Sequence, residues 1–105
     1  MGTSKDRAQE ILSKVEEVAE ARIRPMMGEY ILYVEDIVIG QINEGELFIK
    51  ITDFGEGFAP ELDRESPYGG AKPAFVVPVE KLEDDVWLHD FIAGTVGQLQ
   101  SLKKK

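Results

Sequence analysis

Residues 30–52 read YILYVEDIVIGQINEGELFIKIT, a run rich in β-branched and aromatic residues that two short polar steps interrupt. The steps are Glu35-Asp36 and Asn43-Glu44-Gly45, and both have the length of a hairpin connection. β-branched and aromatic residues favour strands, and hairpin-length connections make neighbouring strands antiparallel. The sequence therefore predicts a meander of three strands, over Tyr30–Val34, Ile37–Ile42 and Glu46–Thr52.

The third predicted strand has two distinct faces, because successive side chains of a strand point to opposite sides. Leu47, Ile49 and Ile51 share one face, which we expect to be the core. Phe48 falls on the other face, so that face is not purely polar. Exposed apolar surface of this kind often marks an interface, and it predicts a homodimer.

Stretches with the apolar spacing of a helix lie both before and after the meander. Apolar residues recur every three or four positions before Pro25, and again after Asp84. Phe54, Phe58 and Leu62 suit a short helix, and Ala74–Val77 suits a fourth strand. The expected order is α-β-β-β-α-β-α. This is one two-layer α+β domain spanning residues 1–105, with an antiparallel sheet of about four to five strands and helices on one face.

Two glycines interrupt the apolar stripe of the last predicted helix. Gly94 and Gly97 each cost about 1 kcal/mol relative to alanine in a helix interior. Either the helix tolerates this cost, or a neighbouring backbone approaches it there. The pattern does not separate the two explanations.

Acidic residues outnumber basic ones by 20 to 12, and the formal net charge is −8. Residues 29–66 hold ten acids against Lys50 and Arg64. Such a segment repels the phosphate backbone, so we expect no direct binding of nucleic acid. No apolar run approaches the roughly 20 residues of a membrane helix, and residues 1–7 are mostly polar, so we expect a cytoplasmic protein that does not enter the membrane.

Catalytic and metal-binding patterns are weak. The single histidine, His89, follows Asp85 by four positions, which allows two metal ligands on one helix face. No third ligand is indicated, and the chain has no cysteine. We therefore expect neither a metal nor a cofactor, and no enzyme activity.

Residues 66–73 read SPYGGAKP and must form a loop. In the interpretation that we favour, Tyr68 packs on the core and the glycines turn the chain. In the alternative, exposed amide groups and Lys72 hold an anion or another small ligand.

Three stretches resemble the signature of the N-terminal domain of the TfoX/Sxy competence regulators. Arg24–Tyr33 is similar to the R-x-M-F-G-G-Y-G start of that family, Gly45–Lys50 to its ELYLK strand, and Pro67–Pro73 to its PY-x-GAKP loop. Met27 replaces the aromatic residue, and Glu29 replaces the second glycine. The matching positions are Met26, Gly28, Tyr30, Lys50, Tyr68, Gly70, Ala71, Lys72 and Pro73.

The resemblance spans the chain from the first helix to about Leu99 and implies a fold like that of secretion chaperones. It also implies a non-enzymatic regulatory role in competence for DNA uptake, exerted through protein contacts. The chain then corresponds to a stand-alone N-terminal domain. The binding residues that it suggests are Gly28, Tyr30, Lys50, Tyr68, Gly70, Lys72 and Pro73. The alternative function is a small-ligand or anion-binding domain that uses the Tyr68–Pro73 loop.

Overall fold

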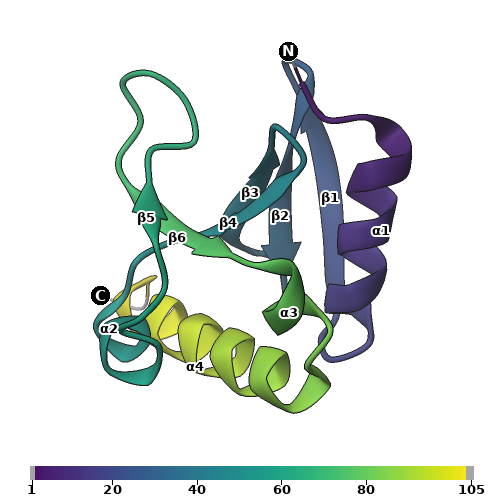
Figure 1. Cartoon of the computed structure of the whole chain (residues 1–105). Helices are drawn as coiled ribbons and strands as arrows, with labels where there is room; N and C mark the ends of the chain where they lie inside the picture. The colour runs from purple at the N-terminus through teal and green to yellow at the C-terminus, as the bar shows by residue number, and fades with distance from the viewer. Residues whose placement is uncertain (1, 104–105) are drawn as a thin grey trace.

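The chain folds into an antiparallel six-stranded sheet with helices packed against one face (Figure 1). The computed structural model describes residues 2–103. Along the chain the elements are α1 (Lys5–Glu16), β1 (Ala21–Met26), β2 (Glu29–Val34), β3 (Ile37–Asn43), β4 (Glu46–Ile49), α2 (Asp53–Phe58), β5 (Arg64–Glu65), β6 (Ala74–Val77), α3 (Val79–Leu82) and α4 (Asp85–Lys103). The strand order is β1-β2-β3-β4-β6-β5. The predicted α+β class and antiparallel sheet are confirmed.

Two-residue turns join the first four strands. Met27-Gly28, Glu35-Asp36 and Glu44-Gly45 all have positive φ at both positions, from 52° to 87°. This is the type I′ geometry, whose twist matches that of the strands it connects. The meander therefore has a fixed register, in which Met26 pairs with Glu29, Val34 with Ile37 and Asn43 with Glu46.

The core lies between the sheet and the helices. Alternate strand residues such as Leu32, Leu47 and Phe75 are fully buried and point to the helical side. The buried apolar residues of the two long helices are Ala8, Ile11, Leu12 and Val15 of α1 and Leu88, Phe91, Ile92 and Val96 of α4. Together they form one hydrophobic cluster. The predicted core face is confirmed for Leu47 and Ile49, whereas Ile51 lies beyond the end of β4 and is half-buried.

Strand β1 is the main departure from the sequence-based expectation. The apolar spacing predicts a helix that runs toward Pro25, yet α1 ends at Glu16 and residues 21–26 form a strand. β1 lies at the edge of the sheet, where Pro25 needs no ladder hydrogen bond on its outer side. The short β5 is a second addition, so the sheet has six strands.

α2 and α4 pack closely at one glycine. A Cβ built on Gly94 would lie 2.1 Å from Cζ of Phe54, whereas a Cβ on Gly97 would meet nothing within 4 Å. Of the two explanations for these glycines, close approach holds at Gly94 only, and the approaching group is an aromatic ring and not backbone.

Among residues 2–103, no helix combines the length and the apolarity that crossing a membrane requires.

Candidate functional site

One face of the sheet is not covered by helices. Register places five side chains in a row across it, because directly paired residues of neighbouring strands point to the same side. The row consists of Arg24, Ile31, Gln41, Phe48 and Val76, from β1 to β6. Phe48 lies on the second face, as predicted, but it is only 4% exposed. The exposed apolar surface on this face therefore comes from other residues.

A long loop between β5 and β6 forms one wall of this face. Residues 66–73, here called the groove loop, extend away from the helical layer (Figure 1). Asn43 holds the loop to β3, since its Nδ2 donates a hydrogen bond to the carbonyl oxygen of Pro67, and both residues are buried. Within the loop, the amide of Ala71 donates to the carbonyl of Tyr68 at 3.1 Å, and Gly70 takes a φ of 86°.

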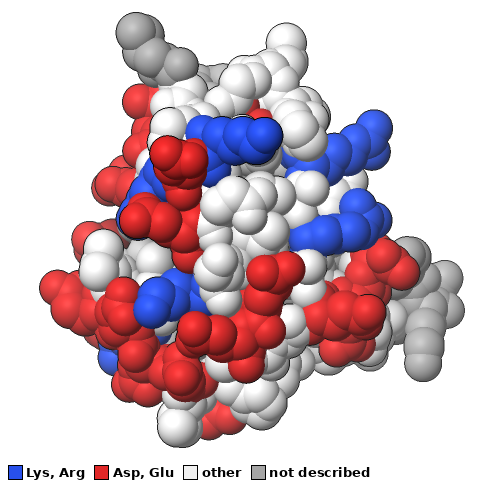
Figure 2. All heavy atoms as spheres, turned by 90° about the vertical axis from the view of Figure 1, so that its right-hand side faces the viewer, with Lys and Arg blue, Asp and Glu red and all other residues white. Residues whose placement is uncertain are grey.

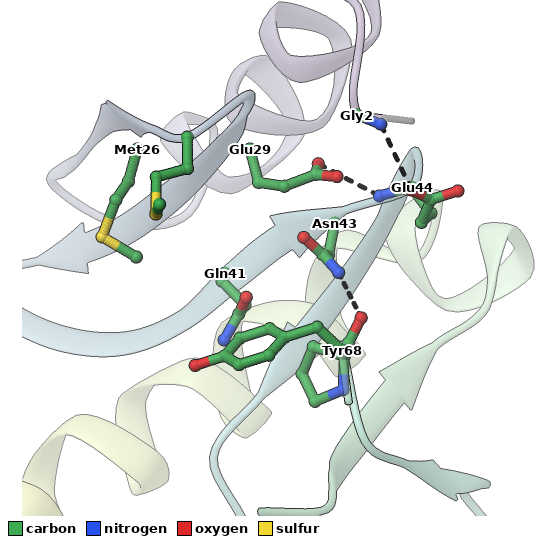
Figure 3. A pocket seen from close by; sticks show the side chains of 9 residues that line it. Gly2, Met26, Glu29, Gln41, Asn43, Glu44 and Tyr68 are labelled. Atoms are coloured by element: carbon green, nitrogen blue, oxygen red, sulfur yellow. Dashed lines mark hydrogen bonds between the residues drawn. The ribbon is translucent and has the colours of Figure 1, made fainter. Parts of the chain in front are cut away.

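Two adjoining hollows lie between the groove loop and the β1–β2 hairpin, and together we call them the open-face groove. The first, of about 680 Å³, is lined by Gly2, Met26, Met27, Glu29, Gln41, Asn43, Glu44, Pro67 and Tyr68. The second, of about 800 Å³, is lined by Met26, Ile31, Val38, Gly40, Gln41, Phe48, Lys50, Ile51, Pro67, Tyr68 and residues 70–74. Figure 3 shows Met26 and Tyr68 on opposite sides of the first hollow, with Gln41 between them.

The groove is flanked by exposed apolar side chains. Met26 is 46% exposed, Tyr68 54% and Met27 96%. Large side chains of this kind lose contact with water when a partner covers them, which favours binding.

The end of the first hollow is closed by a hydrogen-bond cluster. The carboxylate of Glu29 accepts from Oγ1 of Thr3 at 2.5 Å and from the amide of Glu44 at 3.1 Å. The amide of Gly2 donates to the carboxylate of Glu44 at 3.2 Å (Figure 3). The amide of Gly45 donates to Oγ1 of Thr3 at 3.0 Å. The Glu29 carboxylate therefore joins the start of β2 to the β3–β4 turn and to Thr3, and the Glu44 carboxylate joins that turn to Gly2.

The second hollow has a different electrostatic character. Lys50 and Lys72 line it, both are exposed, and no aspartate or glutamate shares its lining. Among the described residues, neither lysine takes part in an ion pair. Two uncompensated positive charges therefore face an apolar floor that contains Ile31 and Phe48.

The favoured interpretation of Tyr68 was wrong. Its side chain is 54% exposed and lines both hollows, so it does not pack on the core. The physical reason is the attachment of the loop: Pro67 is the buried residue, and its carbonyl is bonded to Asn43, so the next side chain is left over the groove.

The structure brings together five of the seven residues suggested for binding. Lys50, Tyr68, Gly70, Lys72 and Pro73 all line the second hollow. The other two lie elsewhere. Gly28 is in the β1–β2 turn, where its carbonyl accepts from the amide of Thr3 at 3.1 Å. Tyr30 pairs with Ile42 and packs against the core cluster.

Sequence reasoning placed Phe48 on this face, but it did not identify the other floor residues of the groove or the anchor of its loop. Ile31, Val38 and Gln41 supply much of the floor, and Asn43 holds the loop. Strand alternation assigns Ile31 and Gln41 to the second face once the register is known. No local signal connects Asn43 to Pro67, which lies 24 positions further along the chain.

Asp85 and His89 were the two candidate metal ligands on one helix face, and in the structure His89 lies against another carboxylate. Nδ1 of His89 lies 3.1 Å from the carboxylate of Asp90, and both side chains are exposed. Among the described residues, no three acidic or histidine side chains gather in an arrangement suited to a metal ion.

Comparison with known proteins finds a relative in a spirochaete. The chain is 31% identical, over 84 residues, to the uncharacterized 12.7 kDa protein in the trpE 5′ region of Spirochaeta aurantia. The aligned segment covers 80% of this chain and 72% of the spirochaetal protein. No model of a known protein family matches the sequence.

Proposed function

The chain belongs to the same family as the 12.7 kDa protein of Spirochaeta aurantia, and from the open-face groove we propose that it is a non-enzymatic domain that binds a partner protein. The observation that carries this proposal is the uncovered face of the sheet. Among residues 2–103, three of the six exposed large hydrophobic side chains, Met26, Met27 and Tyr68, gather around one groove on that face. Contiguous exposed apolar surface beside polar groups is typical of interaction sites.

The chemistry of the groove favours binding over catalysis. Its described lining contains no histidine, and the carboxylates of Glu29 and Glu44 are both engaged in hydrogen bonds. No histidine, aspartate or glutamate accompanies Lys50 and Lys72 in the described lining of the second hollow. A groove of this composition supplies contact area and charge, which is what recognition needs.

The regulatory part of the proposal comes from the resemblance to the TfoX N-terminal domain family. Its signature positions Lys50, Tyr68, Gly70, Lys72 and Pro73 meet in the groove. We propose that the domain acts in the cytoplasm and that it regulates competence for DNA uptake through its partner.

Site-specific photo-crosslinking tests the proposal. A benzoylphenylalanine placed at Tyr68 is expected to crosslink to a partner protein in cells. The same group placed at His89, exposed on α4, serves as the control and should give no such product. Equal crosslinking from both positions, or none from position 68, would refute binding through the groove.

We also propose that a second copy of the chain is one partner. The apolar rim of the groove motivates this, because two such faces hide each other when they stack about a two-fold axis. Light scattering at high micromolar concentration measures it directly. A mass near that of a single 11.7 kDa chain would exclude the homodimer.

Duplex DNA is not expected to be a partner. Acidic side chains gather on the lower half of the face on the α1 side, where α1 ends and α3 and α4 begin (Figure 2). Such a surface repels the phosphate backbone. Salt-sensitive, sub-micromolar binding in an anisotropy titration with duplex DNA would contradict this.

A small-anion site is the second candidate function. Tyr68 is exposed, and the two lysines of the second hollow form no ion pair with any described residue, which favours this function. Phosphate and a nucleotide are suitable probes. A rise in melting temperature that Lys72→Ala removes, with the melting temperature of the free variant unchanged, would support this function.

A further inference from the structure

We infer that the segment bound in the open-face groove is an extended acidic peptide that carries an aromatic or large aliphatic side chain. This inference rests on the proposed function and names the chemistry of the partner. It follows from three features of the molecule: where its unpaired cations lie, what forms the floor between them, and how the groove is shaped.

Of the five cations with described side chains that are not in ion pairs, three lie on the open face. Four described cations are in ion pairs: Arg7 with Glu10, Lys14 with Glu83, Arg22 with Asp36, and Arg64 with Glu56. Among the other lysines and arginines with described side chains, Lys5 of α1 and Lys81 of α3 lie on the helical side.

The remaining three are Arg24, Lys50 and Lys72. Lys50 and Lys72 line the second hollow, and Arg24 pairs directly with Ile31 of its floor. In a chain with 20 acidic residues, three cations without an acidic partner on one face are complementary to a negatively charged ligand.

The floor between these cations is apolar. Ile31, Val38 and Phe48 lie in the second hollow, while Met26 and Tyr68 are shared by both hollows. Methionine adapts its shape to different side chains, and tyrosine offers a flat ring at low entropic cost. An aromatic or large aliphatic side chain therefore fits between Met26 and Tyr68, with the acidic groups of the ligand directed to Lys50 and Lys72.

The shape of the groove favours a peptide over a compact anion. The two hollows share Met26, Gln41, Pro67 and Tyr68, so they adjoin one another beside the groove loop. Their polarity differs, since Glu29 and Glu44 line the first hollow and the lysines line the second. A ligand that spans both hollows must be extended, with its negative charges in the second hollow only.

The charge on the opposite side of the molecule also favours binding of an acidic ligand in the groove. Exposed acids where α1 ends and α4 begins, including Glu16, Glu17, Glu83, Asp84 and Asp85, repel an acidic ligand (Figure 2). The excess of acids there, together with the free lysines of the second hollow, directs such a ligand to the groove.

A displayed library of random peptides that contain one aromatic residue and several acidic residues tests the inference with the whole chain. A second library with lysine at the acidic positions is the comparison. We expect the acidic library alone to be enriched, with affinity that falls as salt is added. Isotope-labelled protein then locates the bound peptide through changes at the amides of Ile31, Gln41 and Tyr68.

Charge-reversal pairs provide the matched control. Lys50→Glu with Lys72→Glu should weaken binding of an enriched peptide by about tenfold or more. Lys5→Glu with Lys81→Glu changes the net charge equally on the other side and should leave the affinity within about twofold. The melting temperatures of both double variants verify that they remain folded.

Each remaining outcome overturns the inference. These outcomes are enrichment of the lysine library, enrichment of neither library, and equal loss in the two double variants. If the crosslinked partner from position 68 binds both double variants as well as the parent, the acidic peptide is excluded but the proposed interaction function stands. Light scattering gives one further outcome that overturns it. If the parent has twice the mass of a single chain and the double variant Lys50→Glu with Lys72→Glu has the mass of one chain, the groove binds a second copy instead.

Discussion

We predict that changing each of the two glycines of α4 to alanine has opposite effects on the stability of the fold. A methyl group added at Gly97 would meet no atom within 4 Å, while one added at Gly94 would face the ring of Phe54. The two sites lie in the same helix and undergo the same chemical change. Any difference between them therefore reports the contact between α2 and α4.

The magnitudes follow from the geometry. Alanine in place of glycine in a helix interior gains about 1 kcal/mol, and Gly97→Ala should realise about 0.5–1 kcal/mol of this. At Gly94 the new carbon would lie 2.1–2.4 Å from three ring atoms of Phe54. That ring is half-buried and stacks on Phe58 with a centroid distance of 5.2 Å, so it must leave a favourable position.

Displacing such a ring resembles overpacking, which costs about 1–3 kcal/mol. After the gain in helix propensity is subtracted, Gly94→Ala should destabilise the fold by about 0–2 kcal/mol. The two variants should thus differ by about 2 kcal/mol, with opposite signs or nearly so.

Urea denaturation of the parent and of the two single variants measures this difference. A double-mutant cycle with Phe54→Ala isolates the contact, since removing the ring should make Gly94→Ala stabilising, like Gly97→Ala. If Gly94→Ala were as stabilising as Gly97→Ala in the parent background, the packing of Phe54 on Gly94 would be refuted.

Three further predictions concern the loops. Asn43→Ala removes the donor to the buried carbonyl of Pro67 and should cost about 1–3 kcal/mol in urea denaturation, with faster proteolysis in the groove loop; unchanged proteolysis would contradict this anchor. Tyr68→Ala should change the free energy of unfolding by less than about 1 kcal/mol while it weakens partner binding, because the side chain is 54% exposed; a loss of several kcal/mol would show that Tyr68 supports the core. Glu35→Asn should stabilise the fold by about 0.5–1 kcal/mol, since Glu35 has a φ of 52° in a two-residue turn that favours asparagine, and a lower melting temperature would count against the type I′ assignment.

The meander was predictable because its signals are local. Runs of β-branched and aromatic residues define the strands, and the short polar steps Glu35-Asp36 and Asn43-Glu44-Gly45 mark the turns between them. The last helix was predictable for the same reason: α4 begins at Asp85, one residue from its expected start. Each of these features depends on residues within a few positions of one another.

Strand β1 was not predictable in this way. Residues 21–26 read ARIRPM, and their exposed Arg22, Arg24 and Pro25 suit a loop as well as a strand. The segment becomes a strand because the Met27-Gly28 turn folds it back onto β2, where it gains a full ladder of pairs. Tertiary pairing outweighs weak local preference there.

The sequence by itself determined the α+β class, the antiparallel meander, the core face, and the position of Phe48 on the opposite face. Those properties follow from the periods of two and 3.6 residues, which any chain with this pattern obeys. Tertiary structure alone decided that Tyr68 is exposed and that Lys50, Lys72 and Met26 border one groove. The physical reason is that the Asn43–Pro67 hydrogen bond joins residues 24 positions apart, and a contact across that distance has no signature in local periodicity.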